Sequence, residues 1–187
     1  MNTKVKIEKM VGDALLVLEA LGVPMAGLSE RRKQKMAKVF LAVAGLKPGQ
    51  AWSKAKDNDD AYQLTTRKII DFVNLYWGES ISSGSYDDIR RKDLVLPVEA
   101  FVVMNSAKNP NANTNDGTRG FAIHPSAAKV IRVFGQPAWK TALKQFHKDQ
   151  PSLASQLRRT RNLARIPVKL SDRQTLTFSP GKHNELQ

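Results

Sequence analysis

The first eighty residues carry three runs in which apolar side chains return every three or four positions. This spacing places them on one face of an α-helix and predicts three amphipathic helices, over residues 5–21, 29–44 and 65–77. Ser29, and either Thr65 or Thr66, can cap the second and third helices by accepting a first-turn N–H, and Gly22 follows the end of the first. Residues 47–58 are polar, contain Pro and Gly, and predict a loop.

A short polar helix is expected next. Ser85 is followed three residues later by Asp88, which resembles a capping box, and the basic run Arg90-Arg91-Lys92 comes directly after it. Pro97 is expected to end this helix, because proline disfavours the helical conformation of the residue before it. The pattern therefore predicts a short helix that is rich in positive charge.

Two strand-like stretches, residues 99–104 and 120–124, flank a segment with the composition of a long loop. Residues 105–119 contain five Asn, one Pro and one Gly, so the three pieces together predict a β-hairpin. Helices followed by a short basic helix and a hairpin have the order of a winged helix-turn-helix, in which the short helix enters the major groove and the hairpin is the wing. The predicted fold class is mainly α, a winged helix-turn-helix-like domain with a small β-hairpin.

The rest of the chain predicts more helix and a change of character after residue 150. Further helices are expected over 125–134, 136–148 and 152–163, and two short strands over 165–170 and 174–178. Residues 179–187 read as a helix start with no helix after it. We therefore expect a helical DNA-binding domain over 1–150, and a basic linker with a truncated β/α start of a second domain over 151–187.

Composition limits the kinds of site and the cellular location that are expected for the protein. The 187 residues are 41% hydrophobic and include no cysteine, which excludes disulfides and thiolate metal sites. No apolar run is long enough to cross a membrane, and the charged amino terminus does not resemble a secretion signal, so a cytoplasmic location is expected.

Charge indicates the class of partner. The chain carries a net charge of +13, of which +3 lies in residues 1–116 and +10 in residues 117–187. A balanced part followed by a cationic part is typical of a folded module joined to a segment that contacts phosphate. Association with the ribosome or with an anionic membrane would produce the same charge.

The sequence contains no recognisable catalytic centre. It lacks a phosphate-binding glycine loop, a nucleophile elbow and a His-Glu-x-x-His pair, and none of its 17 acidic residues is followed two positions later by lysine, as a restriction-type nuclease requires. The histidines at 124, 147 and 183 lack metal-ligand spacing. Asp57, Asp59 and Asp60 lack the glycine and glutamate of a calcium loop, and we interpret them as a solvated loop.

Three groups of residues are candidates for contact with DNA. In the short helix, early exposed positions are expected to reach base edges, and Arg91 or Lys92 to hold phosphate. In the hairpin loop, polar donors suit phosphate or the minor groove, and the basic residues near 160 form a phosphate-binding patch. The candidates are Ser85, Tyr86, Asp87, Arg90, Arg91, Lys92, Asn109, Asn111, Asn113, Arg119, Arg158, Arg159 and Arg161.

Each of these groups also has an interpretation without DNA. Runs of Arg and Lys are often only solvated faces, and an Asn-rich loop can be a polar connection and nothing more. Trp52, Trp77 and Trp139 lie beside apolar helical positions, which favours a place in the core over base stacking.

Several motifs resemble one known family. The passages are residues 83–94 (SGSYDDIRRKDL), 109–111 (NPN), 120–123 (GFAI), 165–170 (RIPVKL) and 178–187 (FSPGKHNELQ). They are similar to the BsuBI/PstI family of type II restriction endonucleases, and the last of them is the most specific.

The resemblance implies an amino-terminal helix-turn-helix domain followed by a magnesium-dependent PD-(D/E)xK catalytic domain, which the His-Asn-Glu-Leu-Gln helix opens. Glu185 matches the acid of that helix and is the one catalytic candidate; the strands that should follow are missing, so this chain alone is not expected to cleave DNA. The complete enzyme would use Mg²⁺ to cut double-stranded DNA at a short palindrome, CTGCAG for the family's prototypes, as a homodimer.

Two other classes remain open at this point. A stand-alone winged-helix transcriptional regulator would need no nuclease domain but would have to end in folded structure. A basic structural or RNA-associated protein would fit the charge, but exposed aromatic stacking motifs are scarce.

Overall fold

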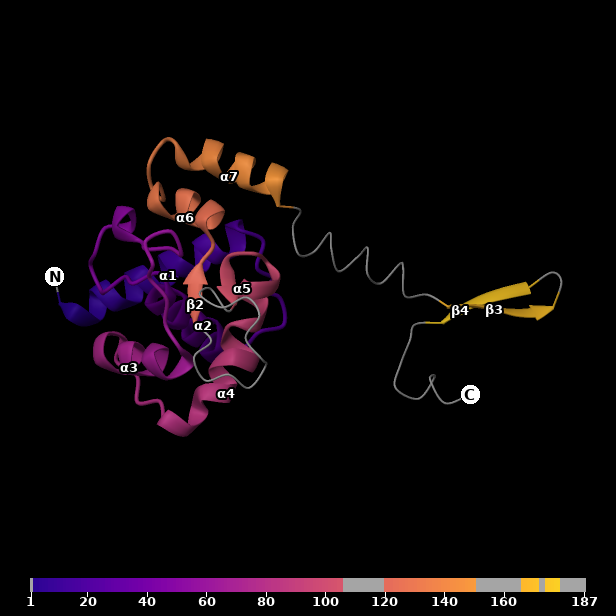
Figure 1. Ribbon diagram of the computed structural model, residues 1–187, viewed down its shortest axis with the longest axis horizontal. Helices are drawn as coiled ribbons and strands as arrows, with labels where there is room; N and C mark the ends of the chain where they lie inside the picture. Colours follow the sequence, from indigo (N-terminus) through magenta and orange to yellow (C-terminus); the bar gives the residue numbers. More distant parts are fainter. Residues whose placement is uncertain (1, 106–119, 151–165, 172–173, 179–187) are drawn as a thin grey trace.

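The computed structural model describes residues 2–105, 120–150, 166–171 and 174–178, and in these ranges it is mainly helical with small antiparallel sheets (Figure 1). The predicted fold class is therefore confirmed. The helices are α1 (Thr3–Ala20), α2 (Glu30–Val43), α3 (Thr66–Trp77), α4 (Tyr86–Asp88), α5 (Val95–Glu99), α6 (Pro125–Arg132) and α7 (Trp139–Asp149). Shorter turns are the 3₁₀ segments Trp52–Lys54 and Ser83–Ser85 and the π-helical segment Ile89–Asp93. The strands are β1 (Val103–Asn105), β2 (Phe121–Ile123), β3 (Ile166–Ser171) and β4 (Gln174–Phe178).

The predicted helix boundaries are confirmed where local chemistry sets them. Ser29 Oγ accepts from the N–H of Arg32 at 3.4 Å, and Thr65, rather than Thr66, caps α3 through the N–H of Lys68 at 3.4 Å. Gly78 ends α3 with φ of 66°, in the left-handed region that favours glycine.

The core forms around α2, which packs against both α1 and α3. Phe40, Leu18 and Trp77 are fully buried there. Trp52 and Trp139 each stack edge-on against Phe134, with ring centroids 5.1 Å apart in both pairs. The prediction that the tryptophans belong to the core is confirmed.

The sheet formed by β1 and β2 completes the arrangement of a winged helix-turn-helix. β1 pairs antiparallel with β2, and on the other side of β2 Leu64 forms an isolated antiparallel bridge with Phe121, through N···O hydrogen bonds of 2.9 and 2.8 Å. The order α2, Leu64, α3, the helical residues 83–93, β1 and β2 is that of a winged helix-turn-helix. The hairpin is confirmed, its loop (106–119) lies outside the described residues, and the Leu64 strand was not predicted.

The short basic helix differs from its prediction at both ends. Ser85 makes no capping hydrogen bond; instead Ser82 Oγ accepts from the N–H of Gly84 at 3.3 Å, so the expected capping box of Ser85 and Asp88 is wrong. Pro97 does not end a helix but lies in the first turn of α5, where proline is tolerated because the first N–H groups of a helix have no acceptor within that helix.

The predicted strand over 99–104 also begins later than expected. Helix α5 continues to Glu99, and Phe101 then adopts φ of 57°, which turns the chain before β1 starts at Val103. The two strands predicted near the carboxyl terminus are confirmed as the antiparallel hairpin of β3 and β4. The expected helices over 152–163 and 183–187 lie outside the described residues.

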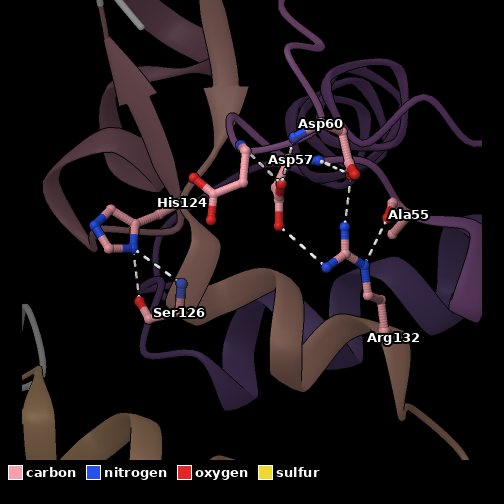
Figure 2. Close-up of polar contacts among 7 residues, drawn as sticks. Ala55, Asp57, Asp60, His124, Ser126 and Arg132 are labelled. Atoms are coloured by element: carbon pink, nitrogen blue, oxygen red, sulfur yellow. Dashed lines mark hydrogen bonds and ion pairs between the residues drawn. The ribbon is translucent and has the colours of Figure 1, made fainter.

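The acidic loop is solvated as predicted at Asp59 and Asp60, which are exposed, but not at Asp57. Asp57 is only 2% exposed, and its Oδ1 accepts from the N–H groups of Asp59 and Asp60 at 2.9 and 3.1 Å. Arg132 of α6 lies 3.1 Å from Asp57 Oδ2 and 2.7 Å from Asp60 Oδ2, and donates to Ala55 O at 2.8 Å (Figure 2). The loop is therefore an anchor that ties α6 to the residues leading into Leu64.

His124 has a structural role beside this anchor. Its Nδ1 caps α6 by accepting from the N–H of Ser126 at 3.2 Å, and lies 2.6 Å from Ser126 Oγ (Figure 2). Burial lowers the pKa of His124 below its ordinary value, and the negative charge of Asp59 partly opposes this. A protonated ring would lose the acceptor that makes the cap.

The free energy of unfolding should therefore decrease as pH falls. Between the lowered pKa of folded His124 and the ordinary value near about 6.5, the unfolded chain binds more protons, so acid favours unfolding in this window. His124→Asn keeps a capping oxygen without titrating. Urea unfolding at about pH 7.5 and about pH 5.5 should show a smaller loss for the variant than for wild type; equal losses would contradict this role.

Candidate nucleic-acid interface

Residues 83–93, which we call the recognition segment, form one surface feature from three short helical turns. Ile89 and Asp93 face the core and are buried, whereas Tyr86, Arg91 and Lys92 are exposed. The π-helical turn Ile89–Asp93, closed by a hydrogen bond from Leu94 N to Ile89 O at 2.9 Å, sets this division between buried and exposed positions. Figure 1 shows α4 beside α3 at the lower edge of the helical domain.

Contacts from α2 hold the recognition segment in place. Arg32 Nη2 donates to Lys92 O at 3.2 Å, and Lys35 Nζ lies 3.4 Å from the buried carboxylate of Asp93. Burial raises the pKa of Asp93, and the nearby charge of Lys35 works in the opposite direction. Helix α2 thus fixes the end of the segment through one backbone and one ionic contact.

The turn before the segment is fixed by α3. The Asn74 side chain donates to Ile81 O at 2.9 Å and accepts from Ile81 N at 2.8 Å, a reciprocal pair that mimics backbone pairing. Arg67 of α3 lies over the Tyr86 ring, 5.7 Å from its centroid. The residues predicted to read bases therefore follow a turn whose backbone α3 holds in place.

Every cation of the basic run has an acidic partner within the recognition segment. Asp87 contacts both arginines, at 2.7 Å from Arg90 Nη2 and 2.7 Å from Arg91 Nε, and Asp88 lies 2.9 Å from Lys92 Nζ. The hydrogen bond from Arg90, with the charges of both arginines, lowers the pKa of Asp87. The structure brings together the predicted residues Tyr86, Asp87, Arg90, Arg91 and Lys92, with Ser85 half-buried at their start.

Asp87 should restrain contact between this surface and DNA, because its charge repels phosphate and occupies two arginines. In Asp87→Asn the repulsion is absent and both arginines are freer, so affinity for duplex DNA of arbitrary sequence should rise several-fold at low salt. Fluorescence anisotropy measures the change. Asp149→Asn, which removes an exposed carboxylate from α7, is the matched control, and an equal rise in both variants would contradict a specific role for Asp87.

The remaining DNA candidates are not placed by the structure. Asn109, Asn111, Asn113 and Arg119 in the wing, and Arg158, Arg159 and Arg161 in the basic patch, lie outside the described residues, as does Glu185. The structure adds two basic residues of α2, Arg31 and Lys35, and two hydroxyl residues of the turn before the recognition segment, Ser80 and Ser82. The sequence patterns did not indicate these residues. The spacing of the α2 residues is that of an ordinary solvated helix face, so no local signal distinguished them.

No group of three or more His, Cys, Asp or Glu side chains in the described residues is placed to hold a metal ion. None of the helices described is long and apolar enough to span a bilayer. His147 Nε2 lies 2.7 Å from Ala20 O and links α7 to the end of α1.

The comparisons with known proteins agree with this geometry. Residues 8–155 match the family model of the BsuBI/PstI restriction endonuclease HTH domain. The chain is 20% identical to the type II restriction enzyme BsuBI from Bacillus subtilis, over 94% of this chain and 53% of that protein. The solved structure of SdaI restriction endonuclease matches with a TM-score of 0.64 and 28% identity, over 92% of this chain and 52% of SdaI.

The element order and its supported recognition segment define a helix-turn-helix domain of the restriction endonuclease class. The chain belongs to the BsuBI/PstI restriction endonuclease HTH domain family. It spans about half the length of the two relatives that it matches.

Proposed function

We propose that this chain is the DNA-binding region of a type II restriction endonuclease and that it docks on double-stranded DNA through its recognition segment. The observation that carries the proposal is the recognition segment itself, which exposes Arg91 and Lys92 and is held by contacts from α2 and α3 at the position of the second helix of a helix-turn-helix. In such motifs this helix enters the major groove, and the preceding helix crosses the backbone.

For the complete enzyme we propose Mg²⁺-dependent cleavage at a short palindrome by a homodimer that works in the cytoplasm as part of a restriction-modification system. Mg²⁺ supplies charge stabilisation and an activated water in phosphodiester hydrolysis. Glu185 is the residue of this chain that we propose as a member of the catalytic site. The role of the described residues is binding and orientation.

A gel shift tests the proposal against an RNA-associated function. The chain is mixed at low salt with a DNA duplex and with an RNA duplex of the same sequence and length. Side chains of the recognition segment fit the wide major groove of B-form DNA and not the deep, narrow one of A-form RNA, so DNA should bind more tightly. Equal or tighter binding of RNA would contradict the proposal.

A further inference from the structure

A polar cleft of about 400 Å³ lies next to the recognition segment, between α2 and the turn that leads out of α3. Basic and amide side chains of α2 form one wall, and hydroxyl groups of the turn form the other. The lining residues are Arg31, Gln34, Lys35, Glu79, Ser80, Ile81, Ser82 and Ser85. Because Ser85 belongs to the recognition segment, the cleft and the segment share an edge.

The cleft wall that carries the serines is held rigidly. Ile81, between Ser80 and Ser82, is fixed from both sides by the Asn74 side chain. Ser82 Oγ accepts from the N–H of Gly84, and Ser82 O accepts from the N–H of Ser85 at 2.9 Å. These contacts hold the exposed Ser80 and Ser82 in one arrangement before any ligand arrives.

Charge in the cleft favours an anion. The one carboxylate in its lining, that of Glu79, is paired with Lys38 at 2.5 Å. Lys35 reaches its acidic partner only at 3.4 Å, and Arg31 is exposed and forms no ion pair or side-chain hydrogen bond within the described residues. Arg31 therefore keeps donors that no group among the described residues uses.

We propose that this cleft binds a phosphate of the DNA backbone, next to the bases that the recognition segment faces. The inference rests on the proposed function and deepens it by naming a second set of contacts. Arg, Lys and Ser side chains commonly hold backbone phosphates, and the turn that carries Ser80 and Ser82 lies directly before the recognition segment. Arg31 supplies the charge, Ser80 and Ser82 supply hydroxyl donors, and Gln34 completes the wall.

The salt dependence of binding tests the site. Each phosphate neutralised by the protein adds about 0.9 to the slope of log K against log salt, so Arg31→Ala should lower that slope by about 0.9 and weaken binding several-fold. The matched control is Lys129→Ala, which removes an exposed cation from α6, on the other side of the domain from α4 in Figure 1. Anisotropy with one duplex of about 20 base pairs measures both variants.

A second pair of variants adds charge instead of removing it. Gln34→Glu places a carboxylate in the cleft, and Gln136→Glu places one at an exposed position before α7. The proposal expects a larger loss of affinity for Gln34→Glu. If wild type binds DNA and each cleft variant equals its control, the cleft site is wrong while the proposed function stands; if wild type binds no duplex, both are wrong.

Discussion

Replacing Arg132 by methionine is expected to lower the free energy of unfolding by about 3 kcal/mol. The buried carboxylate that loses its cation keeps the free-energy cost of desolvation, and no ion pair offsets it. Asp57 is 2% exposed, and Arg132 lies 3.1 Å from its Oδ2. The variant also leaves Ala55 O and Asp60 without the guanidinium donors shown in Figure 2. Urea unfolding at neutral pH measures the loss, which corresponds to about 10 °C in Tm.

The double variant Arg132→Met with Asp57→Asn separates the charge from the packing. Asparagine keeps an oxygen for the N–H groups of Asp59 and Asp60 but carries no charge. The double variant should therefore be more stable than Arg132→Met alone. A change of less than about 0.5 kcal/mol in the single variant, the size usual for surface substitutions, would show that the anchor does not stabilise the fold.

Replacing Arg90 and Arg91 together by alanine is expected to weaken DNA binding by about 100-fold or more at moderate salt. Each arginine that contacts a base or a phosphate contributes about 1–3 kcal/mol. The substitution also leaves Asp87 unpaired on the surface that faces DNA, which adds repulsion. Anisotropy titration with a duplex measures the effect, and the thermal midpoint checks that the variant still folds.

The matched control for this double variant removes the same charge elsewhere. Lys140 and Lys144 are exposed on α7, which Figure 1 shows at the upper edge of the domain, away from α4. Their double replacement by alanine should weaken binding much less. An equal loss in both double variants would remove the recognition segment from the interface and favour the basic patch at Arg158, Arg159 and Arg161.

The parts of the fold that local chemistry determines could be predicted. Ser29 and Thr65 cap helices through N–H groups only three residues away, and apolar spacing alone places α1, α2 and α3. The order of a winged domain also follows from the pattern, because helices and a hairpin differ in period. The family resemblance, carried by short motifs, is confirmed by the family match over residues 8–155.

The parts that long-range contacts determine could not be predicted. The bridge of Leu64 to Phe121 is a single residue pair far apart in sequence, and a one-residue strand leaves no alternating pattern. The pairing of Asp57 with Arg132, which buries one carboxylate of an otherwise exposed acidic loop, could not be predicted for the same reason.

Within the candidate site, the residue types could be predicted from the sequence, but their arrangement in space could not. The Arg90-Arg91-Lys92 run indicated a basic surface, and the structure places it in one segment with Tyr86 and Asp87. The π-helical turn could not be read from the sequence, because it depends on which residues the core buries. The cleft likewise exists only because α2 and the turn after α3 meet in space.

Anisotropy of this chain with a duplex containing CTGCAG and with a scrambled duplex, across a salt series, tests the central claim most directly. The account predicts binding at low salt that weakens steeply as salt rises, since cations of the recognition segment and the cleft displace counterions from phosphates. A preference for the palindrome that survives rising salt would place base readout in this chain as well. Absence of binding to both duplexes at low salt would contradict the account.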